Sequence, residues 1–274
     1  MIIKTLMENT SFSDDFHCEH GLSLYIETKD KKILFDVGAS HLFLENAKKL
    51  NVNIADVDYL IISHGHYDHG GGLSAFLEVN KKAEIFIHHK AFGKYFSIRG
   101  TDDIQYIGLN SNLKDNKQII YTSDRFFITK EIETYSNIKI TSPLPLANYG
   151  LLMEEDGQKK EDSFLHEQNL IIEENGKTIL ITGCSHNGII NIINYFKFLK
   201  GRFPDYVIGG FHLHRRFLNI EESSHEIARV GDFLAQVNAK YFTCHCTGII
   251  PFEKLKAILK DRIEYLSAGR QIKI

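Results

Sequence analysis

Two stretches that lie far apart in the chain show the same order of hydrophobic and polar positions. Residues 20–38 and residues 166–184 each contain two β-rich runs joined by a polar turn. In each case an amphipathic helix pattern, a short apolar strand, a second helix pattern and another short strand follow. The helix patterns cover residues 41–50 and 73–79 in the first half and residues 189–200 and 223–237 in the second. The pattern therefore predicts two copies of a strand, strand, helix, strand, helix, strand unit.

Two such copies can bury their apolar faces by packing against each other. This arrangement predicts a central sandwich of two mixed sheets with helices outside, in which corresponding strand ends meet along one edge. Residues from about 93 to 163 interrupt the repeat, because they mix turn signals with short β-prone pieces. We interpret this segment as an insertion that carries loops over a site, within a single domain of residues 1–274.

Composition and charge narrow the function classes. The chain has 43% hydrophobic and 24% charged residues, as ordinary globular proteins do. Its 32 Lys and Arg residues against 35 Asp and Glu residues give a net charge of −3, so no global positive field attracts nucleic acid or an anionic membrane. Local charged patches stay open, and the partner that we expect is a small-molecule substrate, either phosphorylated or not, with no nucleic acid or membrane. Four cysteines are too few for a disulfide framework, and the first ten residues lack a signal-peptide pattern, so we expect reduced thiols and a cytoplasmic protein.

The densest chemical signal is the run SHGHYDHGGG at residues 63–72, which follows an apolar strand and precedes a helix pattern. Residues two apart in extended backbone project to the same side, so His64 and His66 are expected to share one metal ion. Asp68 and His69 come from the following turn and are expected to face a second ion. Imidazole nitrogen with carboxylate oxygen suits zinc, and also manganese or iron. The sequence therefore predicts two divalent metal ions as cofactors.

The pattern H-x-H-x-D-H after a strand resembles the signature of the metallo-β-lactamase superfamily. This resemblance implies an α/β fold, the four-layered αβ/βα sandwich of two mixed β-sheets, and a binuclear metal site. The runs at residues 182–188, 209–213 and 244–248 resemble a subgroup named after a dihydropterin ribofuranosyl-aminobenzene phosphate synthase.

The resemblance also indicates further ligands. His186 follows an apolar strand at the edge that the repeat selects, and we expect it to join His64 and His66. Members of the superfamily usually have a His before the second hairpin and a bridging Asp after the strand. Here His166 and Cys184 stand at roughly these positions, so whether either one binds metal stays open.

For the second ion the candidate is His245, because the last strand of the repeat ends there and superfamily members take their final ligand from this place. The neighbouring cysteines leave an alternative. Cys184, Cys244 and Cys246 with one His could form a closed structural zinc site.

Two more polar residues stand at strand ends. Asp36 resembles the Asp that in the superfamily accepts a hydrogen bond from a liganding His and fixes its tautomer, with a simple turn residue as the alternative. His212 occupies the H-x-H position of the second copy, and we expect it to contact substrate or donate a proton, with a core histidine as the alternative. The remaining histidines carry no comparable context and are assigned to surface or core positions: His17, His20, His41, His88, His89, His214 and His225.

The expected chemistry is hydrolysis. Two ions that share a hydroxide lower its pKa toward neutrality and polarise the oxygen of a bound ester, lactone or phosphoester. We therefore predict a metal-dependent hydrolase that uses metal-bound hydroxide, with Asp68 holding the second metal and orienting the nucleophile. Lys90 and Arg99 are candidates for binding a phosphorylated substrate, with solvated surface charge as the alternative. A transferase of the kind that the subgroup name implies, and a metal-containing ligand sensor, stay open.

Overall fold

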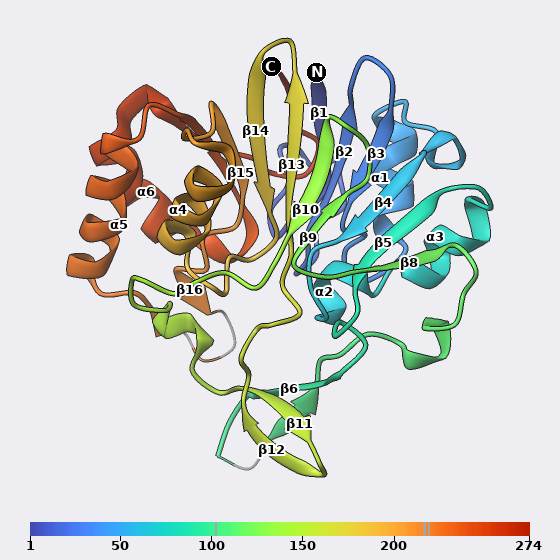
Figure 1. The fold of residues 1–274 in the computed structure, drawn as a ribbon, viewed down its shortest axis with the longest axis horizontal. Coiled ribbons are helices and arrows are strands. Elements are labelled where there is room, and N and C mark those ends of the chain that lie inside the picture. Colours follow the sequence, from blue (N-terminus) through green and yellow to red (C-terminus); the bar gives the residue numbers. More distant parts are fainter. Residues whose placement is uncertain (102, 216–217, 219) are drawn as a thin grey trace.

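The computed structural model describes residues 1–274 except residues 102, 216–217 and 219. Two seven-stranded sheets stand in the centre, with helices on their outer sides (Figure 1). Three buried apolar clusters separate the layers: one lies between the first sheet and its helices, one between the two sheets, and one between the second sheet and its helices. The predicted four-layered αβ/βα sandwich of two mixed sheets is confirmed.

The first sheet is built mainly from the N-terminal half. Its spatial order is β20 (Gln271–Lys273), β1 (Ile2–Met7), β2 (Ser23–Glu27), β3 (Lys32–Phe35), β4 (Tyr59–Ile62), β5 (Glu84–His88) and β8 (Ile119–Thr122). Strands β3, β4, β5 and β8 run parallel, whereas β1 pairs antiparallel with β2 and β2 pairs antiparallel with β3. The parallel strands β3, β4 and β5 are buried on both faces, which explains why their sequences are nearly continuous apolar runs, whereas β8 at the edge is partly exposed.

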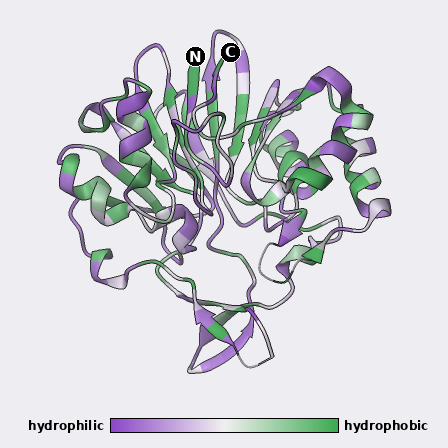
Figure 2. Ribbon diagram, turned by 180° about the vertical axis from the view of Figure 1, so that it is seen from behind, coloured by the Kyte–Doolittle hydropathy of each residue, from purple (hydrophilic) through white to green (hydrophobic). Residues whose placement is uncertain are grey.

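The second sheet repeats this plan. Its spatial order is β19 (Ile263–Tyr265), β18 (Lys240–Thr243), β15 (Tyr206–Gly209), β14 (Lys177–Thr182), β13 (Asn169–Glu174), β10 (Ile132–Tyr135) and β9 (Arg125–Phe127). Again an antiparallel pair, β13 and β14, leads into parallel strands. Figure 2 shows hydrophobic residues gathered along the central strands of both sheets.

Helices form at all four positions that the repeat predicts. The first half contains α1 (Leu42–Lys49), α2 (Tyr67–Gly70) and α3 (Leu73–Val79), and the second half contains α4 (Ile189–Lys200), α5 (Ser224–Gln236) and α6 (Ile249–Leu259). Helices α1, α3, α4 and α5 lie where the repeat predicts them, whereas α2 and α6 were not predicted. The order β2, β3, α1, β4, α3, β5 matches the order β13, β14, α4, β15, α5, β18, so the predicted internal repeat is confirmed. Among the described residues, none of the helices combines the length and the apolar character needed to cross a membrane.

The segment that we interpreted as one insertion contributes to three sheets. Strand β8 joins the first sheet, and β9 and β10 join the second. The rest forms a separate four-stranded sheet, in the order β12 (Gln158–Glu161), β11 (Leu151–Glu155), β6 (Lys94–Ile98) and β7 (Ile104–Tyr106), at the bottom of Figure 1. We call it the small sheet. Short apolar runs within the segment add strands to the edges of the two main sheets. The turn signals in the sequence did not indicate this pairing.

The carboxyl ends of the parallel strands of both sheets point toward the small sheet. Open α/β sheets bind ligands in the crevice outside these strand ends. Asp36 follows β3, Ser63 follows β4, Gly183 follows β14 and Cys244 follows β18. The residues that carry the chemical signal of the sequence therefore converge at one edge of the sandwich.

Helix α4 offers a direct test of the layer assignment. Phe196 is fully buried in the cluster between α4 and the second sheet, whereas Phe198, on the same helix, is 78% exposed. We expect Phe196→Ala to lower the free energy of unfolding by about 3–5 kcal/mol, because it removes core contacts and leaves a cavity. Phe198→Ala is the matched control and should change it by less than about 0.5 kcal/mol. Urea unfolding followed by circular dichroism measures both, and equal losses would contradict this packing.

Candidate metal centre

The loop after β4 brings the histidines of the motif into the interior. His64, His66 and His69 are all buried, and Asp68 is nearly so. Gly65 between the first two has no room for a side chain, because a Cβ atom there would lie 2.4 Å from the carbonyl oxygen of Ala91. His66 keeps an extended backbone and α2 begins at the next residue, so the chain turns from strand to helix within the motif.

The carboxylate of Asp36, itself fully buried, anchors this loop. The backbone N–H of Ser63 donates to one carboxylate oxygen at 2.7 Å, and the Ser63 hydroxyl donates to the other at 2.7 Å. The ring Nδ1 of His69 lies 2.6 Å from that second oxygen and donates to it. The same hydroxyl accepts from Nδ1 of His64 at 2.8 Å. One carboxylate thus orients His69 directly and His64 through Ser63, as carboxylates do beside metal-binding histidines.

Three histidines, His64, His66 and His186, bring their ring nitrogens together, and we call them the first ligand group. Nε2 of His64 lies 3.3 Å from Nε2 of His186. Two nitrogens that bind one tetrahedral zinc ion at about 2.1 Å lie about 3.4 Å apart, so this spacing fits a shared ion. Nε2 of His66 is buried without a hydrogen-bond partner among the described residues, and a carboxylate oxygen of Asp162 lies 3.8 Å from it. A buried polar atom with no partner is costly, and a metal ion would satisfy it.

A second set of side chains lies beside the first, and we call it the second ligand group. It consists of His20, Asp68, His69 and His245. Nε2 of His69 lies 3.2 Å from Nε2 of His245, which in turn lies 3.3 Å from the Asp68 carboxylate. Nε2 of His20 approaches the same carboxylate oxygen at 3.3 Å. Nitrogen and carboxylate ligands at these separations fit a second divalent ion.

The histidines present Nε2 to the centre because their Nδ1 atoms are tied to oxygen acceptors outside it. His186 donates from Nδ1 to the side-chain oxygen of Asn148 at 2.9 Å, and His245 donates to that of Asn9 at 2.8 Å. With His64 and His69 held by Ser63 and Asp36, four rings share this orientation. Fixing the tautomer in this way is what neighbouring hydrogen bonds do for metal-binding imidazoles.

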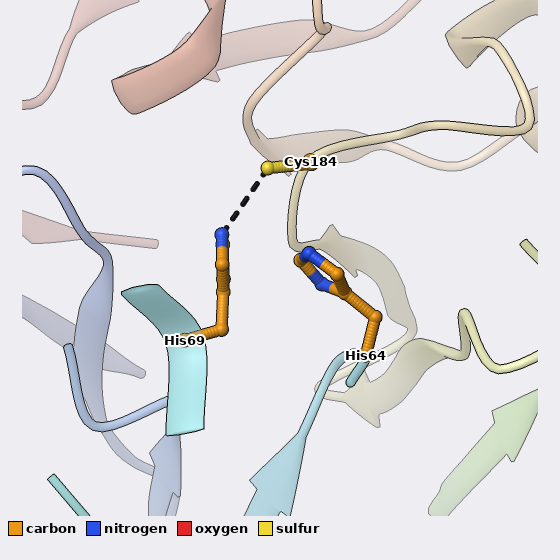
Figure 3. Close-up of side chains that lie close together, drawn as sticks. All are labelled: His64, His69 and Cys184. Carbon is orange, nitrogen blue, oxygen red and sulfur yellow. Dashed lines mark hydrogen bonds between the residues drawn. The ribbon is translucent and has the colours of Figure 1, made fainter. Parts of the chain in front are cut away.

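Cys184 lies between the two ligand groups. Its sulfur is 3.1 Å from Nε2 of His69 (Figure 3). The ring of His64 lies beside that of His69, with the two centroids 4.1 Å apart. The same sulfur lies close enough to share a metal ion with His64 and His69, and also with His245 and Cys246. A ligand in this place could bridge two ions, which is the position that the superfamily pattern gives to an Asp.

His166 is placed differently from His186. Its Nδ1 accepts the backbone N–H of Gly65 at 2.9 Å, and its Nε2 donates to the Asp162 carboxylate at 3.0 Å. Both ring nitrogens are therefore engaged in holding the loop. The structure brings His186 to the first ligand group and uses His166 as a support beneath it.

The charges around the centre favour a cation. Burial disfavours the charged form of His69, but the Asp36 and Asp68 carboxylates outweigh it and raise the pKa of His69 to about 9. Burial, together with neighbouring histidines, holds the pKa values of His64 and His186 well below the usual range, so both rings are neutral and free to bind metal. The Asp36 and Asp68 carboxylates thus stabilise positive charge at the position of His69.

Several residues of the centre hold a left-handed backbone conformation that side chains other than glycine rarely adopt. Asp36, Ser185, His212 and His245 have φ between 51° and 66°. Such conformations cost energy and persist only where surrounding contacts over-determine them, which is typical of functional sites. Their concentration at the strand ends marks this edge as one shaped for function.

A cavity opens at the centre, and both ligand groups contribute to its wall. His212, 6% exposed, lines it with both ring nitrogens lacking a hydrogen-bond partner among the described residues, and its ring lies 4.1 Å from that of His186. Arg99 also lines this cavity. Lys90 is exposed and lies along a different groove, beside His89 and Lys114, so the two predicted substrate-binding cations are not brought together.

Three basic residues of the cavity wall were not selected from the sequence: His20 and His214, which were assigned to surface or core positions, and Arg215. A signal for His20 was present, because the repeat aligns it with His166, and both rings lie at the centre. Arg215 belongs to the short strand β16 (His214–Arg215), which pairs with β17 (Ile220–Glu221), and no local pattern indicated it.

Comparisons with known proteins agree with this geometry. The sequence profile of the metallo-β-lactamase superfamily matches residues 18–107. An uncharacterized protein of Methanocaldococcus jannaschii is 33% identical over 94% of both chains. The 7,8-dihydropterin-6-methyl-4-(β-D-ribofuranosyl)-aminobenzene-5'-phosphate synthase of the same organism is 32% identical over 99% of this chain and 96% of its own. The crystal structure of a metal-dependent hydrolase of the β-lactamase superfamily superposes with a TM-score of 0.84, at 28% identity, over 100% of this chain and 99% of its own.

Metal content tests the two ligand groups. We expect His64→Ala and His69→Ala each to lower the number of bound divalent ions per chain from two, because each removes a ligand nitrogen. His166→Gln is the control, since an amide can still accept from Gly65 and donate to Asp162, and it should keep both ions. Elemental analysis of purified, metal-loaded protein measures the count. Unchanged stoichiometry in both alanine variants would refute the assignment.

Proposed function

Because this chain belongs to the metallo-β-lactamase superfamily, we propose that it is an enzyme that uses two divalent metal ions to hydrolyse a small ester, lactone or phosphoester. The observation that carries the proposal is the pair of ligand groups joined at Cys184, with Nε2 atoms directed inward and a cavity beside them. Zinc suits this set of nitrogen, carboxylate and sulfur ligands best, with manganese or iron as alternatives.

The proposed ions would be held by His64, His66 and His186 on one side and by the second ligand group on the other, with Cys184 shared as a thiolate. When bound, two such ions activate a water molecule and polarise the oxygen of the scissile group.

Asp68 and His212 have separate tasks in this proposal. The Asp68 carboxylate, fixed between His20 and His245, holds one ion and orients the attacking water from the side of the second ligand group. His212 lines the cavity beside His186, and its ring nitrogens have no hydrogen-bond partner among the described residues. In this proposal it would protonate the leaving group. No side-chain nucleophile is needed for such a reaction.

The second candidate is a synthase that joins two substrates, and the similarity to the named synthase over nearly the whole chain favours it. The two functions differ in the number of organic substrates that turnover requires. We expect metal-loaded protein to turn over members of a panel of phosphodiesters and lactones singly, with water as the second reactant. Turnover only when two organic substrates are present together would favour the synthase, and metal binding without any turnover would indicate a sensor.

The cysteines indicate the redox compartment in which such an enzyme works. Cys184 and Cys246 are buried free thiols at the centre. A shared thiolate ligand is preserved in a reducing compartment, so we infer that the protein works in the cytoplasm. Its partner in this proposal is a small-molecule substrate, with no nucleic acid or membrane involved.

The role of His212 predicts a leaving-group effect. His212→Asn suits the left-handed backbone there, because Asn tolerates that conformation, but it cannot supply a proton. We expect the variant to keep both ions and to lose about 10²–10⁴ in kcat for an alkyl leaving group, the usual scale of general acid catalysis. The loss should shrink for a nitrophenolate, which leaves without protonation. Loss of one metal ion in this variant would instead make His212 a ligand, and equal losses for both leaving groups would refute the acid.

A further inference from the structure

Two arginine side chains from different halves of the chain line the cavity of the metal centre. Arg99 follows β6 of the small sheet, and Arg215 ends β16 in the second half. Neither chain segment carries a metal ligand. The cavity is therefore lined both by members of the two ligand groups and by two arginine residues.

The guanidinium of Arg215 is only partly satisfied. The side chain is 5% exposed, and its Nη2 donates to the Ser97 hydroxyl at 2.9 Å and to the Ile98 carbonyl at 3.0 Å. These bonds tie it to the small sheet. Its Nη1 is buried and has no hydrogen-bond partner among the described residues. A buried donor of this kind is unfavourable unless a ligand accepts from it.

The charge of Arg215 is also uncompensated. In the described part of the chain, no carboxylate lies within ion-pair distance of its guanidinium. Burial and the nearby charge of Arg99 lower the pKa of Arg215 to about 10, so it stays positive at neutral pH. Two like charges that line one cavity and act on each other create a site that attracts an anion, and guanidinium groups bind phosphate oxygens in a paired geometry.

We propose that Arg99 and Arg215 together bind a phosphate monoester group of the substrate. Two positive charges match a phosphate dianion better than a single carboxylate, and the free Nη1 supplies a donor that nothing else in the described chain uses. This inference rests on the proposed function, because the two arginines would hold the substrate so that its reacting bond faces the ligand groups. The proposed substrates are therefore phosphorylated small molecules.

Calorimetric titration with phenylphosphonate tests the proposal without relying on turnover. This probe carries a dianionic group on a carbon–phosphorus bond, and benzoate serves as the monoanionic comparison. In metal-loaded protein we expect Arg215→Gln and Arg99→Gln each to weaken phenylphosphonate binding by about 10-fold or more, the scale of a charge-assisted hydrogen bond. Arg215→Lys keeps the charge and should recover part of the affinity. Arg270→Gln, which removes an exposed arginine elsewhere, is the matched control and should leave the affinity unchanged.

The outcomes separate this inference from the proposed function. Unchanged phenylphosphonate affinity in both glutamine variants, with metal content intact, would overturn the anion site even if hydrolysis is observed. A larger loss for benzoate than for phenylphosphonate would also overturn it, in favour of a carboxylate substrate. Variant-dependent binding without any hydrolysis would keep the anion site and overturn the hydrolase. If Arg215→Gln does not fold, Arg99→Gln decides, because Arg99 is only half-buried.

Discussion

The buried carboxylate of Asp36 is the interaction on which the centre depends. It receives the Ser63 backbone and hydroxyl groups and the ring of His69 at 2.6 to 2.7 Å, and all three residues are fully buried. In such surroundings hydrogen bonds to a charged group are strong, and an unmet charge would be costly. The strand end, the start of the motif and one member of the second ligand group are therefore fixed together. His64 follows, because its Nδ1 bonds to the same Ser63 hydroxyl.

The rest of the centre comes from the second half of the chain, and the internal repeat explains how it arrives. The apolar cluster between the sheets aligns the two copies, so that the ends of their parallel strands meet at one edge. His186 and Cys184 follow β14, and His245 follows β18. Hydrophobic packing thus sets the distance between the halves, and the outward Nδ1 hydrogen bonds set the orientation of four of the rings, those of His64, His69, His186 and His245. Neither device alone would direct the Nε2 atoms to common points.

The sequence predicted the features that depend on local pattern. The alternation of strand and helix signals indicated the two copies, and the spacing of the H-x-H-x-D-H motif indicated a metal-binding loop. Features set by tertiary contacts were harder to predict. His20 lies far from the motif in sequence and has no liganding neighbour, yet the fold carries it to Asp68 at 3.3 Å. Arg99 and Lys90 are close in sequence, but β6 runs between them and leads their side chains to different cavities.

The central claim is that two ligand groups, joined at Cys184, hold two ions. The most direct measurement is a crystal structure of metal-loaded protein with anomalous diffraction recorded on both sides of the metal absorption edge. The account predicts two anomalous peaks, one within about 2.0–2.2 Å of the Nε2 atoms of the first ligand group and one among the ligands of the second. A single peak enclosed by Cys184, Cys246 and His245, with the Nε2 atoms of the first ligand group turned away, would contradict it.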